Sequence, residues 1–203
     1  MKSLLAKTAL LSATFAFATV FVLAADKSEW NPEPGYTVLY NGKDLTGWSY
    51  RDKEGKPTES LTGKKDAADG RYSAKGESLT VNPHDEAKGP RIRQLWSAQE
   101  FGKDFHLKLE FRAAVNADSG IFLRRPQLQC RDYLVAGPYK DLKKYKPQGW
   151  NEIEVTVKGD VATCTCNGEA LAFTNKLPAT GPIGLEADRG QMEYRRIRIK
   201  ELP

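Results

Sequence analysis

The sequence predicts an all-β domain built as a sandwich of two antiparallel sheets. Beyond residue 24, apolar and polar residues alternate in short runs, and no stretch keeps an apolar period of 3.6 residues over three helical turns. Glycine, asparagine and proline separate the runs at short intervals, which is typical of sandwiches and barrels. Because the sequence has no internal repeat and no low-complexity linker, one domain with two packed sheets is the simplest interpretation.

The first expected strands are bounded by turn residues or show clear alternation. The strand at 36–40 leads into Asn41-Gly42, a turn whose glycine tolerates a positive φ. Residues 78–81 and 92–97 are short runs of strand-forming residues. The clearest strand covers residues 105–113, in which every odd-numbered residue is apolar and the polar residues stand between them.

The second half of the chain is divided by stronger signals. Pro126 separates two strands because proline cannot donate to a sheet ladder, Gly159-Asp160 forms a turn, and Asn167-Gly168 predicts a tight hairpin. The expected strands here cover residues 119–124, 127–133, 151–158, 161–166, 169–173, 183–187 and 192–202, and long irregular connections are expected at 49–77 and 134–150.

The first 24 residues predict a cleavable secretory signal peptide. Lys2 and Lys7 precede an almost wholly apolar run at 10–23, and Val22 and Ala24 occupy positions −3 and −1 for cleavage after Ala24. A membrane anchor is the alternative, but this run is shorter than the roughly 20 residues that a span needs. We therefore expect a signal peptide at 1–24, an N-terminal extension at 25–35 and one domain at 36–203, exported to the periplasm or the extracellular space.

Charge and composition exclude several classes of partner and cofactor. Without its two leader lysines the chain has 29 basic and 26 acidic residues, a net charge of +3, and no clustered basic face for nucleic acid. No stable membrane span is expected after signal cleavage. Two histidines and no ligand pairs at metal-site spacing argue against zinc. No cofactor is evident, although a Ca²⁺ held by loop carbonyls and Asp side chains would leave little trace in the sequence.

The three cysteines are Cys130, Cys164 and Cys166. An exported chain meets an oxidising compartment, so we expect one disulfide and one remaining thiol. Cys164 and Cys166 would point to the same face of their strand. We therefore expect Cys130 to pair with one of the two.

Strand alternation also predicts which side chains face away from the core. If the apolar residues of each strand point inward, Glu110 and Arg112 point outward from 105–113, and a set of polar or aromatic residues points outward from the later strands. Trp48, Trp96 and Trp150 stand beside apolar strand residues and are expected in the core. The outward set of the later strands is Phe122, Arg124, Gln127, Gln129, Arg131 and Glu186, with Asp188 just past its strand end.

These outward residues form one surface if their strands are neighbours. Carboxylates and guanidinium groups hydrogen-bond hydroxyls, and Phe122 suits the apolar face of a sugar ring, so the surface would fit a polyhydroxylated ligand. Glu110 and Glu186 would then be the carboxylate pair that acid–base work on glycosides requires. The alternative is an ordinary solvated face whose charges form cross-strand pairs.

Several stretches resemble one protein family. Residues 38–48 read Val-Leu-Tyr-Asn-Gly-Lys-Asp-Leu-Thr-Gly-Trp and resemble the opening of the domain of unknown function 1080, also called the 3-keto-disaccharide hydrolase domain. The resemblance spans about residues 36–202 in the right order. The other agreeing stretches are 105–112 with 119–124, then 150–152, and 181–185 with 197–199.

The resemblance implies a jelly roll like that of concanavalin-type lectins and glucanases, usually in exported bacterial proteins. It also implies activity on glycosides oxidised at C3, in which a base removes the C2 proton, the glycosidic oxygen is expelled, and water adds afterwards. By position, Glu110 or Glu186 would be the base, and Arg112, Arg124 or Arg131 the partner of the enolate oxygen, with Arg131 preferred. Gln129, Phe122 and Asp188 would bind the substrate, together with the arginines that are not catalytic.

One departure from the family pattern bears on the chemistry. Many relatives carry Gln-Asp-His-Gly where this chain reads Glu186-Ala187-Asp188-Arg189-Gly190. Any acid–base duty of that histidine would fall to Glu186 or Asp188, or be absent. An enzyme predicts Glu110 and Glu186 within about 10 Å of each other in a pocket, one with a raised pKa. A non-catalytic carbohydrate-binding module predicts a shallow face with exposed rings, and a structural envelope protein predicts a face filled by its own ion pairs.

Overall fold

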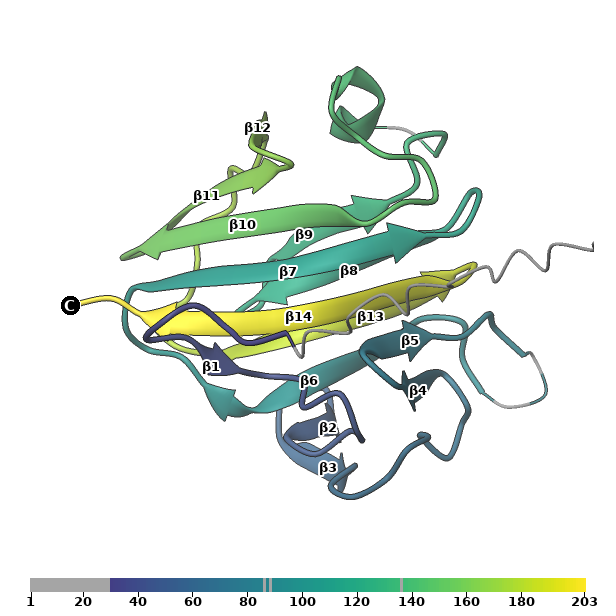
Figure 1. Ribbon diagram of the computed structural model, residues 1–203. Helices are drawn as coiled ribbons and strands as arrows, with labels where there is room; N and C mark the ends of the chain where they lie inside the picture. The colour runs from purple at the N-terminus through teal and green to yellow at the C-terminus, as the bar shows by residue number, and fades with distance from the viewer. Residues whose placement is uncertain (1–29, 86, 88, 136) are drawn as a thin grey trace, which may run out of the picture. The chain divides into compact units, whose positions relative to one another are not determined.

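The strands lie in two antiparallel sheets, as the alternation predicts (Figure 1). The computed structural model describes residues 30–85, 87, 89–135 and 137–203. Residues 32–203 form one compact unit. The expected signal peptide and the first residues of the expected extension lie outside the described residues. Among those that are described, no helix is both long enough and apolar enough to cross a membrane.

The larger sheet, sheet A, contains β1 (Thr37–Val38), β4 (Tyr72–Lys75), β5 (Ser78–Val81), β7 (Phe105–Ala113), β10 (Asn151–Lys158), β11 (Val161–Cys166), β12 (Glu169–Leu171) and β14 (Met192–Glu201). Their order is β12-β11-β10-β7-β14-β5-β4, and β1 also pairs with β14. A bulge in β14 between Arg195 and Arg198 shifts its register against β7.

The smaller sheet, sheet B, contains β2 (Trp48–Arg51), β3 (Pro57–Ser60), β6 (Arg93–Glu100), β8 (Asp118–Leu123), β9 (Gln127–Arg131) and β13 (Pro182–Arg189). Their order is β3-β2-β6-β13-β8-β9. The strand β13 therefore lies in the middle of this sheet, with β6 on one side and β8 on the other.

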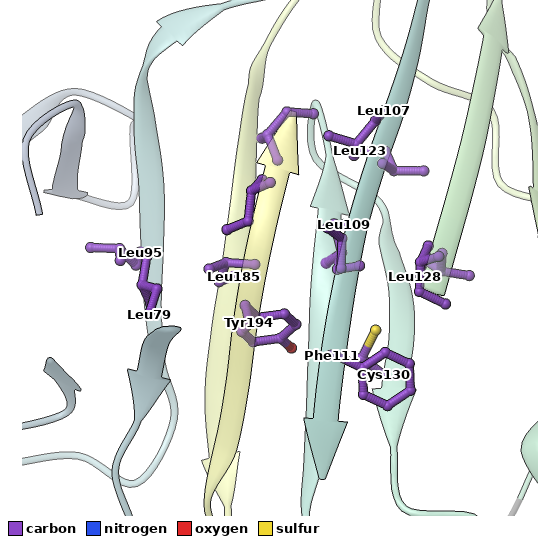
Figure 2. Close-up of a cluster of buried hydrophobic side chains, with 14 of the residues drawn as sticks. Leu79, Leu95, Leu107, Leu109, Phe111, Leu123, Leu128, Cys130, Leu185 and Tyr194 are labelled. Atoms are coloured by element: carbon purple, nitrogen blue, oxygen red, sulfur yellow. The ribbon is translucent and has the colours of Figure 1, made fainter. Parts of the chain in front are cut away.

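The core lies between the two sheets (Figure 2). Leu107, Leu109 and Phe111 of β7 point inward from sheet A, and Leu123 and Leu185 point inward from sheet B, all of them fully buried. Complete burial of one such side chain contributes about 1.5–3 kcal/mol. This burial fixes the register, because a shift by one residue would turn every apolar side chain of a strand outward.

Most predicted strands are confirmed, and the exception is the stretch 49–77. It is not an irregular connection, because it contains most of β2 together with β3 and β4. Each of these strands has only four residues, too few for alternation to stand out, and β3 begins with Pro57. The described part of 134–150 contains the short 3-10 helix η2 (Pro138–Asp141).

The predicted disulfide is wrong, since all three cysteines are free and buried. Cys130 points inward from β9 of sheet B, whereas Cys164 and Cys166 lie on β11 of sheet A. All three belong to the hydrophobic core between the sheets, where they pack as small apolar side chains. Burial raises the pKa of both Cys164 and Cys166 to about 12, so these thiols are protonated core side chains.

Candidate functional site

Polar side chains gather on the outer face of sheet B, which is the face turned away from the core. Glu186 of β13 points outward between the buried residues Leu185 and Ala187. Its Cα partners are Gln94 of β6 and Gly120 of β8, and Gly120 is paired in turn with Gln129 of β9. Glu186 therefore lies at the centre of a row that crosses four adjacent strands.

A chain of hydrogen bonds connects Glu186 to the edge strand β9. The Gln127 amide donates to Oε2 of Glu186, and Nε2 of Gln129 donates to Oε1 of Gln127 at 3.1 Å. The Arg131 guanidinium donates to Oε1 of Gln129, and its Nε lies 3.3 Å from Oδ1 of Asp118. These hydrogen bonds hold each of the side chains in one orientation on the sheet surface.

Gly120 leaves room for the hydrogen bonds that connect Glu186 to β9. A Cβ at this position would lie 2.0 Å from Nε2 of Gln127 and 2.6 Å from its Cγ. Without a side chain at Gly120, the Gln127 amide can lie across β8 and reach Glu186 on β13. Gly120, in the family-like stretch 119–124, thus makes space for the hydrogen bonds between Gln127 and Glu186.

The environment of Glu186 favours the protonated carboxyl. Burial raises the pKa of Glu186 above its ordinary value of 4.5, and the nearby Asp188 and Asp118 carboxylates raise it further. The hydrogen bond from Gln127 and the charge of Arg131 act in the opposite direction without cancelling the rise. Burial also raises the pKa of Asp118. A carboxyl with a raised pKa, partly buried beside other carboxylates, has the character of a residue that exchanges protons in an active site.

An aromatic pair lies next to Glu186 on the same face. The rings of Trp96 and Phe122 have centroids 4.9 Å apart. Gly184, the Cα partner of both residues, lies between them. A Cβ on Gly184 would lie 2.6 Å from two atoms of the indole ring, so the Trp96 ring occupies the space that a side chain would take.

A pocket of about 700 Å³ opens on the β6 side of Glu186. Gln94, Trp96 and Arg93 line it from β6, and Asp52–Gly55 and Arg125 line it from two loops. Glu186 is not itself a lining residue, but its Cα partner Gln94 is. Because neighbouring strands are about 4.8 Å apart, Glu186 lies at the border of the pocket.

The structure brings together five of the predicted site residues: Phe122, Gln129, Arg131, Glu186 and Asp188 all belong to the outer face of sheet B or its margin. The Asp188 carboxylate lies 3.3 Å from Nε of Arg91. The clustering confirms the strand alternation within β8, β9 and β13. Their roles in binding and catalysis remain predictions.

Glu110 and Arg112 do not belong to this face. They point outward from β7, whose neighbours are β10 and β14 of sheet A. Glu110 is held by Arg195 at 2.7 Å and by Arg196 at 2.9 Å, and Arg112 pairs with Glu193 at 2.6 Å. The prediction of a close Glu110–Glu186 pair is therefore wrong, because the two carboxylates lie on opposite outer faces of the sandwich.

Arg124 also departs from its prediction as a surface ligand. It is 2% exposed and adopts a positive φ of 62° directly after β8. Its guanidinium donates to the backbone carbonyls of Phe101, Lys103, Gly159 and Pro178, at distances of 2.8–3.2 Å. The chain turns at Arg124, so the alternation of the strand no longer predicts where its side chain points. Its guanidinium instead connects three loops through these hydrogen bonds.

Alternation alone identifies two site residues that were not predicted. Since Leu95 is buried, its neighbours Gln94 and Trp96 must face outward, yet Trp96 was expected in the core. Trp48 is buried as expected, and Trp150 is half-buried between the guanidinium groups of Arg112 and Arg195. Asp118 has no such signal, because it begins its strand and only its ion pair with Arg131 places it in the site.

Within the part of the chain that the structure describes, no three His, Cys, Asp or Glu side chains are grouped so that they could hold a metal ion.

Comparison with known proteins places this chain among sugar-related domains. The family model described as "3-keto-alpha-glucoside-1,2-lyase-like domain" matches residues 35–200. Two solved structures from Parabacteroides distasonis, each described as a "putative glycosyl hydrolase", share the fold. One is 16% identical with a TM-score of 0.62 over 83% of this chain and 95% of its own. The other is 18% identical with a TM-score of 0.57 over 82% of this chain and 99% of its own. No curated protein matches the chain.

Proposed function

Because the chain belongs to the family of 3-keto-alpha-glucoside-1,2-lyase-like domains, we propose that it cleaves glycosides oxidised at C3, with the outer face of sheet B as its active site. The observation that carries this proposal is Glu186, a half-buried carboxyl with a raised pKa, placed between a pocket and a fixed arginine. A carbohydrate-binding module needs no such acid.

The ketone determines the chemistry. It acidifies the C2 proton, so a carboxylate can take that proton while the electron pair of the C–H bond moves into a C2–C3 enolate. The enolate then re-forms the ketone and expels the glycosidic oxygen from C1, leaving a double bond between C1 and C2. Water adds across this bond afterwards. The protein must supply a base at C2, a cationic partner for O3 and a proton for the departing oxygen.

Glu186 is proposed as the base. Its carboxyl faces outward at the centre of the sheet face, and its raised pKa strengthens it as a base relative to an ordinary carboxylate. Once it has taken the C2 proton, it can return that proton to the departing oxygen. The same residue can thus serve both halves of the elimination, which agrees with the absence of the histidine that many relatives carry nearby.

Arg131 and Gln129 are proposed to bind the oxygen on C3. Arg131 is fixed on its two sides by Gln129 and Asp118, so its position does not have to change during the reaction. A preorganised cation near a developing enolate oxygen is among the strongest catalytic devices in enzymes. Asp188 and the neutral amide of Gln127 would complete the surface under the sugar ring, and the largely buried Phe122 would support that surface through its contact with Trp96.

The direct test is an assay of the purified protein. It is incubated with a 3-keto-disaccharide and, separately, with the unoxidised parent sugar, with and without EDTA, and release of free sugar is followed. Release from the keto form alone would support the proposal, and a loss of release in EDTA would show that a divalent ion such as Ca²⁺ takes part. Binding by calorimetry without release would favour the carbohydrate-binding module instead.

The pH dependence of the reaction should follow Glu186. Because the base must be ionised, kcat/KM is expected to rise with pH and to reach half its plateau above pH 4.5, the ordinary carboxyl pKa. The raised pKa also means that the folded state binds more protons than the unfolded state just above pH 4.5. The free energy of unfolding should therefore decrease as the pH rises from 4.5 to the raised pKa of Glu186 in the folded protein. Rate and stability are measured across pH 4–8, and a half-plateau at or below pH 4.5 would contradict Glu186 as the base.

We also propose that the protein acts after export, in the periplasm or outside the cell. The support is the leader-like pattern of residues 1–24. N-terminal sequencing of the protein purified from the native organism tests this, with Ala25 expected as the first residue. An N-terminus at Met1 would contradict export with cleavage.

A further inference from the structure

We propose that Trp96 and its pocket receive the leaving group, and that Trp96 selects a hydroxylated ring there over a small alkyl group. This assignment rests on the proposed function, since it concerns the same site. It adds where the departing part of the substrate lies and which side chain distinguishes between leaving groups.

The order of the strands supports this placement. In the sugar ring C2 stands between C3 and C1, so a base at C2 has the ketone on one side and the leaving oxygen on the other. On the sheet, Glu186 of β13 has Arg131 and Gln129 on the β8–β9 side. On its other side, β6 and the loop at Asp52–Gly55 line the pocket, which also extends to the turn at Arg124–Arg125. If Arg131 binds the C3 oxygen, the C1 substituent must extend over β6 and into the pocket.

Trp96 offers a flat apolar surface at the entrance to this pocket. Its ring lies over Gly184 and packs against Phe122, which is itself 6% exposed, so the indole is held in place. The ring remains partly exposed and lines the pocket. A sugar ring has an apolar face that can cover such an indole, whereas a methyl group would cover little of it.

Charged groups stand around the rest of the pocket. Arg51 pairs with Glu100 at 2.7 Å, and the guanidinium of Arg93 lies 3.9 Å from the centre of the Tyr50 ring and 3.1 Å from Asp69 through its Nε. The residues among these that line the pocket are Tyr50, Arg51, Arg93 and Glu100. Such groups can hydrogen-bond the hydroxyls of a sugar ring, and an apolar leaving group offers them no such partner. A flat apolar wall and a polar rim together fit a hydroxylated ring.

The test compares two substrates that share the 3-keto-glucosyl unit but differ in the leaving group. One is a 3-keto-disaccharide and the other is methyl 3-keto-glucoside. Trp96→Ala is expected to lower kcat/KM for the disaccharide about tenfold, mainly through KM. The value for the methyl glycoside should stay within about twofold, because its leaving group does not reach the ring.

Two further variants control the experiment. Trp96→Phe retains an aromatic ring, so the ratio of kcat/KM for the disaccharide to kcat/KM for the methyl glycoside should fall by only about two- to threefold. This variant serves as the test if Trp96→Ala does not fold. Glu110→Gln, on the outer face of sheet A and away from the pocket, should leave kcat/KM for both substrates within about twofold. An equal loss on both substrates, or no loss on either, would overturn the assignment while leaving the proposed function in place. No turnover of either substrate by the unaltered protein would overturn both.

Discussion

Glu186→Gln is expected to lower kcat by about 10²–10⁴-fold, the usual contribution of a general base. The substitution keeps the shape of the side chain, and its amide oxygen can still accept the hydrogen bond from Gln127. Because burial already disfavours the charged form of Glu186, as its raised pKa shows, removing the charge should leave the melting temperature nearly unchanged. Single-turnover kinetics with a 3-keto-disaccharide, together with thermal unfolding, measure both effects.

Glu110→Gln is the matched control. Glu110 is 15% exposed and holds Arg195 and Arg196 on the other outer face of the sandwich. Its substitution should leave kcat within about twofold and lower the free energy of unfolding by about 1 kcal/mol. Full activity in Glu186→Gln would remove that residue from the catalytic role, and a large loss in Glu110→Gln would show that sheet A takes part in the reaction.

Arg124→Ala should have the largest effect on stability, about 3–5 kcal/mol. The substitution removes a buried side chain and leaves four backbone carbonyls, which belong to three separate loops, without the hydrogen bonds of Arg124. Urea unfolding at neutral pH measures the change.

The neighbouring Arg125 provides the comparison. It is exposed and lines the pocket, and its guanidinium lies close to the position that a side chain at Gly55 would take. Arg125→Ala should therefore change the free energy of unfolding by less than about 0.5 kcal/mol. Equal effects of the two substitutions would show that the hydrogen bonds of Arg124 do not stabilise the fold.

The sequence alone determined the fold class and the inward or outward direction of most strand residues. Alternation in 105–113 directs Leu107, Leu109 and Phe111 into the core, and they are buried there. The same alternation turns Glu186, Gln129 and Arg131 outward. These predictions succeed because the period of two is a local property of the strand, and burial of the apolar half enforces it.

Tertiary structure alone decided which outward residues share a face. Glu110 and Glu186 alternate in the same way along their strands, yet β7 lies in sheet A and β13 in sheet B. Alternation distinguishes inside from outside but not one sheet from the other, since both sheets direct their apolar residues to the same core. Alternation also directed the three cysteines to the core, where all of them lie, but a shared core does not by itself place two thiols in bonding geometry, and all three are free.

The site depends on contacts between strands that are distant in the chain. Gln127 reaches Glu186 across Gly120, and Trp96 occupies the space above Gly184. In the sequence Gly120 and Gly184 are only parts of family-like stretches. The structure shows that they leave space for side chains of neighbouring strands, because β6, β13, β8 and β9 are adjacent. Local patterns set the direction of each side chain, whereas the order of strands in a sheet is set by the packing of the whole chain, and it was that order which placed the base, the arginine and the pocket together.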